Sequence, residues 1–296
     1  MTATTFLEDC ALTAGVVKNL EQAWAPLAEA PGPWLLIAEG SSRLVPLGLA
    51  KRFTRAIGTC LIDGCSGRLA PNDWPGTLVA LSNSGKTREV YEALHGKQYL
   101  AITGLADGPL TKEAHASIAV LPRPEQAVAA TASVIGQSYV LLAALAAKYN
   151  QQLETPSFLK ALEHIHVPEL PEVKQLWIVG ADDGVAEELA LKAWETAGMP
   201  AAPVATGLAL HGMEEVLGAG HVVWVIESAA SDRTAIEDRI HPTQATLLFL
   251  ETPDIGHLTP LLRLATGWQW LAQWALRKGR DPAIPTRARK IGNEIT

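Results

Sequence analysis

The stretch LVALSNSGKTREVYEAL, residues 78–94, joins an apolar run, a polar loop and the start of a helix. Residues 78–81 are typical of a short buried strand, and residues 88–94 of a helix start. The loop between them, SNSGKT, carries three hydroxyl side chains in six positions. A strand, a Ser/Gly turn and a helix start gather free backbone N–H groups and hydroxyls around one point, which suits a phosphate group. The three hydroxyls favour a bound phosphate over the simpler alternative, serines that only cap the helix.

The end of this loop, Gly85-Lys86-Thr87, also matches the end of a nucleotide-binding P-loop, G-x-x-x-x-G-K-[ST]. The first glycine of that pattern would fall at position 80, where the chain has Ala80. That glycine lets the loop wrap around the phosphates of a nucleotide. Its absence favours a monophosphate ligand over ATP.

The composition limits the classes of function. The chain has 296 residues, of which 48% are hydrophobic, and 24 Lys+Arg against 31 Asp+Glu give a net charge of −7. This balance argues against a nucleic-acid surface, so a bound anion must be held by a local site. No apolar run reaches the ~18 residues that span a membrane. The three cysteines form no C-x-x-C pair and no signal peptide precedes them, which predicts a reduced, cytoplasmic protein.

The two halves of the chain repeat one pattern. Residues 34–38 (WLLIA) and 176–181 (LWIVGA) are apolar strands, each followed by a short polar turn and a helical stretch, at 44–53 and 185–197. The next strands correspond as well, 77–81 with 222–226 and 99–103 with 246–250. The repeat predicts two α/β units with parallel sheets, whose ligands bind at the carboxyl ends of the strands. Gly40-Ser41-Ser42 and the loop at 82–87 both fall there.

The boundaries follow from composition. We expect a first unit at residues 1–152, opened by a helix at 5–28, and a proline-containing linker with a short helix at 153–173. A second unit at 174–278 ends in an apolar helix, 260–278, whose tryptophans would lie in the core or a subunit contact, and a polar tail fills 279–296. In the linker, His164 and His166 form an H-x-H pair, which more often means partly exposed side chains than metal ligands.

The order of several motifs resembles the sugar isomerase (SIS) domain family. Residues 82–89, SNSGKTRE, resemble its S-x-S-G-x-T-x-E motif, and the chain over nearly its full length resembles the two-SIS module of glucosamine-6-phosphate synthases and the related phosphosugar isomerases, deaminases and deglycases. Gly40-Ser41-Ser42 is similar to the family's G-T-S loop, ALKAWETAG (190–198) to its A-L-K-x-K-E segment, and Leu210-His211-Gly212 to its K-H-G. Asp281-Pro282 and the residues after it resemble its C-terminal tail.

The resemblance implies two flavodoxin-like three-layer α/β/α units in tandem, and a role for each matching residue. The sugar phosphate would be held by Ser41, Ser42, Ser82, Asn83, Ser84 and Thr87, with Val128 against the sugar. Glu195 would move the proton between C1 and C2, with Lys192 near the enediol oxygens. His211 would open the sugar ring and reach the site of a neighbouring subunit, which implies a homodimer with shared active sites, and Lys290 would come from the tail as it closes the site.

Some positions depart from the family pattern. Ala130 and Ala132 stand where the family has a serine and a lysine that face or support the sugar. Leu208 replaces a glutamate and Met213 a proline near His211. Residue 2 is Thr rather than the nucleophilic cysteine of the synthase glutaminase, so we expect no glutamine-fed ammonia from this chain. These changes bear on the substrate more than on the reaction class.

Aldose–ketose isomerisation needs one base, and a carboxylate can act if burial raises its pKa. Glu195 lies in a stretch rich in Ala, Leu and Trp, sixteen residues before His211 as in the family. The simpler alternatives are an exposed glutamate paired with Lys192 at i−3 and a core or interface histidine. We expect Lys192 or Lys290 to stabilise the enediolate, with no metal and no cofactor.

Three functions remain at this point. The first is a phosphosugar isomerase, or a deaminase or fructosamine-6-phosphate-type deglycase that adds C–N hydrolysis to the same proton transfer. The second is a non-catalytic sugar-phosphate-binding protein, although the chain has no room for the DNA-binding segment of SIS regulators. The third, a nucleotide-binding P-loop protein, is disfavoured by Ala80.

Overall fold

The buried runs become the central strands of two parallel sheets. The computed structural model describes residues 4–20, 22–59, 61–167, 171–287 and 294–295. The run WLLIA forms strand β1 (Trp34–Ala38), and all five of its residues are buried. The run at 78–81 lies in β3 (Thr77–Ser82), and the helix after it, α4, spans Arg88–Leu94 as the sequence predicts. Both expectations from the opening stretch are confirmed.

The first sheet has the strand order β2-β1-β3-β4-β5, with every pair parallel. Its remaining strands are β2 (Ile62–Cys65), β4 (Leu100–Thr103) and β5 (Ala116–Ala119). The helices of this unit are α1 (Thr4–Asn19), α2 (Ala25–Glu29), α3 (Ser41–Ala56), α4, α5 (Pro109–Glu113) and α6 (Ala132–Lys148), with a 3₁₀ turn η1 (Gly67–Leu69). This order is flavodoxin-like, with its topological switch point between β1 and β3.

The second sheet repeats the arrangement with the order β7-β6-β8-β9, again parallel throughout. Its strands are β6 (Gln175–Gly180), β7 (Ala201–Ala205), β8 (His221–Val225) and β9 (Thr246–Phe249). Its helices are α8 (Val185–Lys192), a π-helical turn η2 (Ala193–Ala197), α9 (Thr206–Ala209), α10 (Ala230–Ile240) and α11 (Thr259–Arg277), with 3₁₀ turns η3 (Met213–Val216), η4 (His241–Thr243) and η5 (Gly256–Leu258). Two α/β units in tandem are therefore present.

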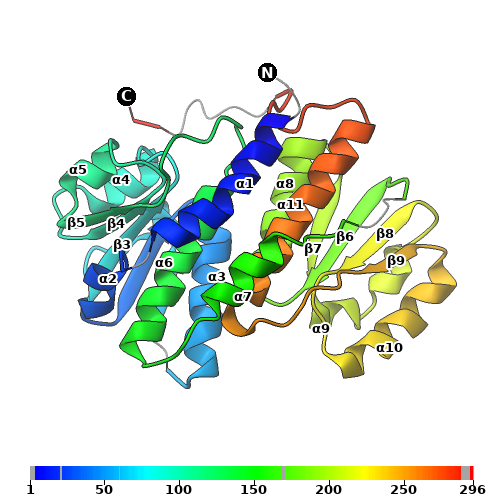
Figure 1. The fold of residues 1–296 in the computed structure, drawn as a ribbon. Helices are drawn as coiled ribbons and strands as arrows, with labels where there is room; N and C mark the ends of the chain where they lie inside the picture. The colour runs from blue at the N-terminus through cyan, green and yellow to red at the C-terminus, as the bar shows by residue number, and fades with distance from the viewer. Residues whose placement is uncertain (1–3, 21, 60, 168–170, 288–293, 296) are drawn as a thin grey trace.

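A layer of helices between the two sheets belongs to both units (Figure 1). One continuous core holds Leu36 of β1, Val45 of α3, Leu189 of α8 and Trp268 of α11. The outer faces have separate cores, under α4 and α5 in the first unit and under α9 and α10 in the second. The tryptophans of α11 lie in the shared core, where the ring of Trp270 stacks on Trp224 with centroids 4.6 Å apart.

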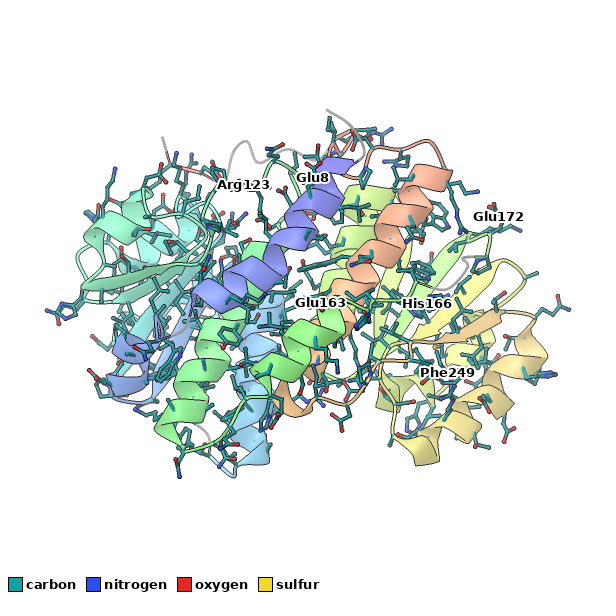
Figure 2. The ribbon with its side chains drawn as sticks, viewed as in Figure 1. Glu8, Arg123, Glu163, His166, Glu172 and Phe249 are labelled. Carbon is teal, nitrogen blue, oxygen red and sulfur yellow. The ribbon has the colours of Figure 1, made fainter. Side chains whose placement is uncertain are left out.

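The linker is also part of this layer. Its short helix is α7 (Thr155–Leu162), and Phe158 on α7 is fully buried in the shared core. Glu163 and His166, both labelled in Figure 2, follow at the surface, and His164 is exposed as well. Across the described residues, no helix is long and apolar enough to cross a membrane.

The expected N-terminal helix at 5–28 is wrong in its extent. The chain forms α1 and then, after a break, α2, because Pro26 cannot donate to the helical ladder and clashes with the preceding turn. Gln22 in the break has a φ of 66°. The helical stretch at 185–197 is continuous, but its last five residues form the π turn η2, a type of turn frequent at functional sites.

Candidate active site at the junction of the two units

The loop at 82–87 is tied together by its own hydroxyls. Ser82 ends β3 and is buried; its Oγ lies 2.8 Å from Oγ1 of Thr87 and accepts a hydrogen bond from the Gly85 N–H at 3.0 Å. Ser84 Oγ accepts from the Lys86 N–H at 3.2 Å. The hydroxyls thus shape the loop before any ligand is bound, and Asn83, Ser84 and Thr87 remain partly exposed at its surface.

This loop rests on the turn after β4. Gly85 has a φ of +68°, and its carbonyl accepts the Leu110 N–H at 3.1 Å. A Cβ at Gly108 would lie only 2.6 Å from the Gly85 carbonyl oxygen, so a side chain there would push the loop out of place. Close backbone packing therefore fixes the loop at the carboxyl edge of the first sheet.

A charged cluster connects the two units beside this edge. Lys192, at the end of α8, donates from Nζ to the Oγ of Ser41 at 2.8 Å and to Oε2 of Glu195 at 2.9 Å. The same ammonium lies 2.9 Å from Oε1 of Glu188, one turn earlier on α8. Ser41 is the first residue of α3 in the first unit, and Ser42 beside it is buried. Three predicted residues, Ser41, Lys192 and Glu195, are therefore in contact.

The electrostatics of this cluster keep Lys192 charged. Burial alone would lower the pKa of its fully buried ammonium, but attraction to Glu188 and Glu195 outweighs burial, so the pKa is raised above its ordinary value. Glu188 is also fully buried, whereas the side chain of Glu195 is 27% exposed. The π turn thus directs a partly accessible carboxylate toward a cation that Glu188 already compensates.

Val128 lies on a loop held by two carboxylates. Asp9 of α1 is buried and accepts the N–H groups of Gln126 and Ala127 at 2.7 and 2.8 Å. Glu125 accepts the N–H and Oγ1 of Thr131 at 2.7 and 2.9 Å, so it caps the start of α6. The loop is therefore rigidly placed, although no residue of it contacts Lys192 or Glu195 directly among the described contacts.

The tail touches both sides of this region. The Val128 N–H donates to the carbonyl of Ala283 at 3.1 Å, near the start of the tail. Farther along, Glu294 forms an antiparallel bridge with Thr87, and the Ile295 N–H donates to the Lys86 carbonyl at 2.9 Å. The described parts of the tail, on either side of residues 288–293, thus contact the Val128 loop and the loop at 82–87. Lys290, predicted to reach the sugar, lies outside the described residues.

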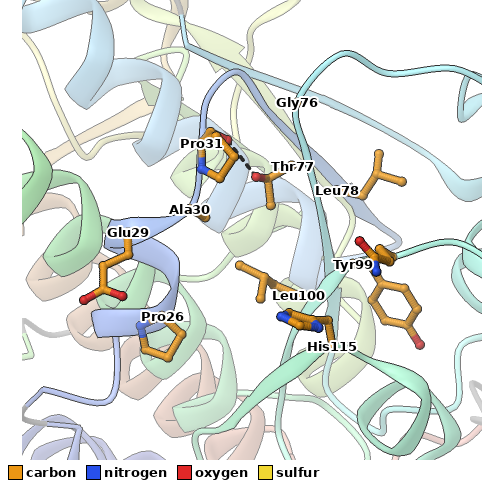
Figure 3. A pocket seen from close by; sticks show the side chains of 11 residues that line it. Pro26, Glu29, Ala30, Pro31, Gly76, Thr77, Leu78, Tyr99, Leu100 and His115 are labelled. Carbon is orange, nitrogen blue, oxygen red and sulfur yellow. Dashed lines mark hydrogen bonds between the residues drawn. The ribbon is translucent and has the colours of Figure 1, made fainter.

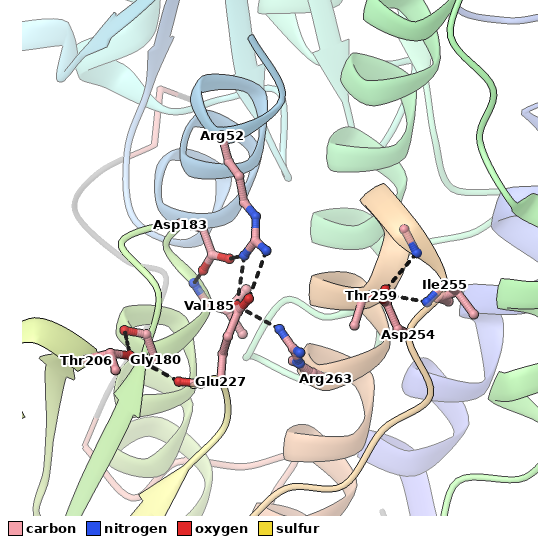
Figure 4. Close-up of polar contacts among 11 residues, drawn as sticks. Arg52, Gly180, Asp183, Val185, Thr206, Glu227, Asp254, Ile255, Thr259 and Arg263 are labelled. Carbon is pink, nitrogen blue, oxygen red and sulfur yellow. Dashed lines mark hydrogen bonds and ion pairs between the residues drawn. The ribbon is translucent and has the colours of Figure 1, made fainter. Parts of the chain in front are cut away.

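The turns after the second sheet's strands hold a different set of groups (Figure 4). Arg52, on α3 of the first unit, donates from Nη1 to Asp183 at 2.7 Å and binds both carboxylate oxygens of Glu227 at 2.8 Å. Arg263 of α11 lies 2.7 Å from the same Glu227. Burial alone would raise the pKa of Glu227, but the two arginines outweigh it, and its pKa is lowered. Charged side chains from both units therefore fill this place.

A pocket at the other edge of the first sheet contains no predicted site residue (Figure 3). Its volume is about 390 Å³, and Pro26, Glu29, Thr77 and His115 are among its lining residues. Thr77 there donates to the Pro31 carbonyl at 2.6 Å. The pocket lies at the amino ends of the strands, away from the edge where α/β sheets bind ligands.

Solved structures with the same fold support the resemblance seen in the motifs. Glucosamine-6-phosphate deaminase from Thermotoga maritima has a TM-score of 0.79 at 20% identity, covering 97% of this chain and 98% of that one. The C-terminal domain of glucosamine-fructose-6-phosphate aminotransferase from Francisella tularensis has a TM-score of 0.75 at 14% identity, with coverage of 95% and 98%. Tagatose-6-phosphate ketose/aldose isomerase from Escherichia coli has a TM-score of 0.72 at 17% identity, with coverage of 97% and 99%. No family model and no curated protein sequence matches the chain.

The chain has the double-SIS fold. Within this fold His211 stands apart from the cluster around Lys192. It lies after α9 and is exposed, and no described contact joins its side chain to another predicted site residue. Leu208 and Val216 nearby in the chain are 64% and 55% exposed.

Some residues that build this candidate site were missed in the sequence. Glu188 stands four residues before Lys192, an i,i+4 spacing that signals an ion pair on a helix. Glu125 lies six residues before Thr131, the N-cap residue of α6, so its position in the sequence did not mark it as a partner of that helix. Asp9 carried no signal, because its partners lie more than a hundred residues away.

Proposed function

We propose that this chain is a phosphosugar isomerase-type enzyme, which isomerises or deaminates a phosphorylated sugar or amino sugar through an enediol or enediolamine intermediate. The observation that carries the proposal is the contact of Lys192 with Ser41 and Glu195. It places a cation and a carboxylate from the second unit beside a hydroxyl from the first. Such a pair can move one proton between adjacent carbons and stabilise the charge that develops.

The phosphate is proposed to bind at the switch point of the first sheet. Ser41 and Ser42 follow β1, while Ser82, Asn83, Ser84 and Thr87 follow β3, its neighbour in the sheet. The carboxyl ends of these two strands flank the crevice in which flavodoxin-like sheets bind ligands. The loop at 82–87 is already fixed from beneath, so little ordering cost would accompany binding.

The chemistry proposed for the cluster follows from its charges. Glu195 takes the proton from one sugar carbon and returns it to the next, and Lys192 stays protonated because its pKa is raised. Glu188 compensates Lys192 in the free protein. When Glu195 accepts a proton, its pull on the ammonium weakens, and Lys192 can donate to the enediolate oxygen instead. A neutral nucleophilic role for Lys192 does not fit this electrostatic setting.

His211 is proposed to open the sugar ring in the active site of a second copy. Its exposed position, outside the cluster of its own chain, and the exposed Leu208 and Val216 support a homodimer. Apolar area buried between copies would stabilise such a contact. A monomer in solution that retains full turnover would contradict this part of the proposal.

The tail is proposed to close the active site, with Lys290 near the sugar. The contacts of Ala283 with Val128 and of Glu294 with Thr87 support a path across the site. Deleting residues 284–296 removes no core helix, so the protein should fold with nearly unchanged melting temperature and lose turnover. Full activity of the truncated protein on the same substrate would contradict this role.

The function is tested with a substrate panel in D2O. Fructose 6-phosphate, glucosamine 6-phosphate and a fructosamine 6-phosphate of an amino acid are followed by NMR for deuterium at C1 or C2, with ammonia or amine release measured in parallel. Exchange with at least one sugar is expected, and release separates deaminase and deglycase from isomerase. Binding of these sugars without exchange would instead indicate a non-catalytic binding protein.

A further inference from the structure

A second cleft lies between the two units, along α3 and the start of α8. Its volume is about 250 Å³. Its lining includes Arg43, Lys51 and Arg55 from α3 and Asp182 and Glu187 from the second unit. At its base α3 crosses the turn before α8 without side chains between them: a Cβ at Gly48 would lie 2.1 Å from the Asp183 carbonyl oxygen. The base is therefore backbone, and the walls carry the charges.

The wall from the first unit is basic. Arg43, Lys51 and Arg55 stand at multiples of four residues along α3, so they form one stripe on the helix. Lys51 is engaged with Asp63 at 3.1 Å. The guanidinium groups of Arg43 and Arg55 make no hydrogen bond or ion pair with any residue that the structure describes. Two planar donor groups thus face the cleft with free donors.

The wall from the second unit is acidic. Oε2 of Glu187 is buried and has no hydrogen-bond partner among the described residues. Burial raises the pKa of this carboxyl. The exposed Asp182 adds a second carboxylate. No ion pair within the described part of the chain joins this wall to Arg43 or Arg55, so opposite charges face one cleft without neutralising each other.

We propose that this cleft binds a small zwitterion, a molecule with a carboxylate or phosphate group and an ammonium group. Arg43 and Arg55 would hold the anionic group, for which a guanidinium provides paired N–H donors. The carboxylate of Glu187, which lines the other wall, would accept the ammonium. The volume is below the ~300–1,000 Å³ of pockets for drug-sized ligands, which suits a molecule of amino-acid size. None of the residues proposed to hold the sugar phosphate lines this cleft, so the inference does not rest on the proposed function.

A ligand with a single charge would leave one wall uncompensated. An anion alone would bring a second negative charge to Glu187, and a cation alone would add to the charge of the two arginines. A molecule with both groups matches both walls, because its anionic group meets the guanidinium donors and its ammonium group meets Glu187. Binding should therefore require both charges on one molecule.

The test is calorimetric titration of the full chain with each of the twenty amino acids and with phosphoethanolamine, which separates the carboxylate and phosphate sources. Acetate, inorganic phosphate and methylammonium are the single-charge controls. At least one zwitterion should bind at least tenfold more tightly than each single-charge control. Arg55→Met and Glu187→Gln should each weaken that binding tenfold or more.

The matched control is Glu163→Gln, which removes an exposed carboxylate beyond α7 (labelled in Figure 2) that does not line the cleft. It should bind the zwitterion like the unchanged protein. The proposal is overturned if no zwitterion binds, if a single-charge control binds as tightly, or if either cleft variant binds normally. Both cleft variants alter surface or half-buried positions, and an unchanged melting temperature confirms that they fold.

Discussion

The turns at the carboxyl ends of the two sheets carry different kinds of side chain at corresponding places: hydroxyls in the first unit and carboxylates in the second. In the first unit the turns after β1 and β3 present Ser41, Ser42 and the loop at 82–87. In the second unit the turns after β6 and β8 present Asp183 and Glu227, and both carboxylates bind Arg52. One edge offers neutral donors suited to an anion, whereas the other offers anions already bound to guanidinium groups.

The difference shows how a repeated fold can divide its tasks. At the carboxyl edge of the second sheet, Arg52 of the first unit occupies the position where a ligand could bind. Its ion pairs with Asp183 and Glu227 connect the two units there. Asp183 is almost fully buried and would be costly without its partner. The second unit contributes to the proposed chemistry through α8 and η2 instead, which carry Lys192 and Glu195 toward the first edge.

The largest effect should come from Glu195→Gln, which tests whether the second unit supplies the base. The amide keeps the shape but cannot take a proton, so turnover should fall by at least ~100-fold while sugar-phosphate binding survives. Steady-state kinetics and calorimetric binding measure the two quantities. Near-normal deuterium exchange at C1 or C2 in the variant would show that the base lies elsewhere.

The second prediction tests whether only the first edge binds phosphate. Ser84→Ala or Thr87→Ala removes one hydroxyl contact to a charged group and should weaken sugar-phosphate binding by roughly 1–3 kcal/mol. Ser228→Ala, in the corresponding loop of the second unit, is the matched control and should leave binding unchanged. Equal losses in both loops would remove the distinction between the two edges.

The third prediction concerns the ion pairs of Arg52 at the carboxyl edge of the second sheet. Arg52→Met leaves Asp183 and Glu227 with one partner fewer. Because the Arg52 side chain is 40% exposed, the loss should be smaller than for a fully buried ion pair. We expect the free energy of unfolding to fall by about 2 kcal/mol. Chemical denaturation measures this loss. Lys160→Met, at an exposed position on α7, is the control and should change stability little.

A second substitution sharpens the same comparison. Adding Asp183→Asn to Arg52→Met removes the uncompensated carboxylate, so part of the lost stability should return, and the two changes should not be additive. Additive losses would mean that the two side chains contribute independently, and that Arg52 does not close the second edge through Asp183.

The smallest effect is expected at His257, whose ring lies 4.5 Å from that of Phe53. Burial and the charge of Arg52 lower its pKa below the ordinary value, so the unfolded chain binds a proton more readily. His257 therefore reduces stability as the pH falls through about 6.5 toward its lower folded value. His257→Gln should narrow the difference in melting temperature between pH 7 and pH 5; an unchanged difference would contradict this.

The sequence was most informative where local pattern and function coincide. Buried runs located β1, β3, β6 and β8, and the hydroxyl-rich loop located the first edge. The break between α1 and α2 was missed although Pro26 signalled it, because the apolar residues on both sides resemble one helix. The edge strands β2, β5 and β7 were missed as well, since β2 and β5 are only partly buried and β7 contains Pro203.

Contacts in the candidate site could be predicted only where both residues lie close together in the sequence. The pair of Lys192 with Glu195 is local and was considered from spacing alone, as an alternative to catalysis. The contact of Lys192 with Ser41, and those of Arg52 with Asp183 and Glu227, join residues more than a hundred positions apart. Such pairs depend on how the two units pack, which no local pattern in one sequence encodes.

The shared helical layer has a consequence for how the chain can be divided or exchanged. A chain cut within the linker would give two fragments, each with an apolar helical face stripped of its cover. Such fragments would be insoluble when produced singly and recoverable when produced together, as complementing halves. For the same reason, a chimera between relatives should keep its function when both halves come from the same parent. Exchanging a single half would require matching substitutions in the helices that pack against it.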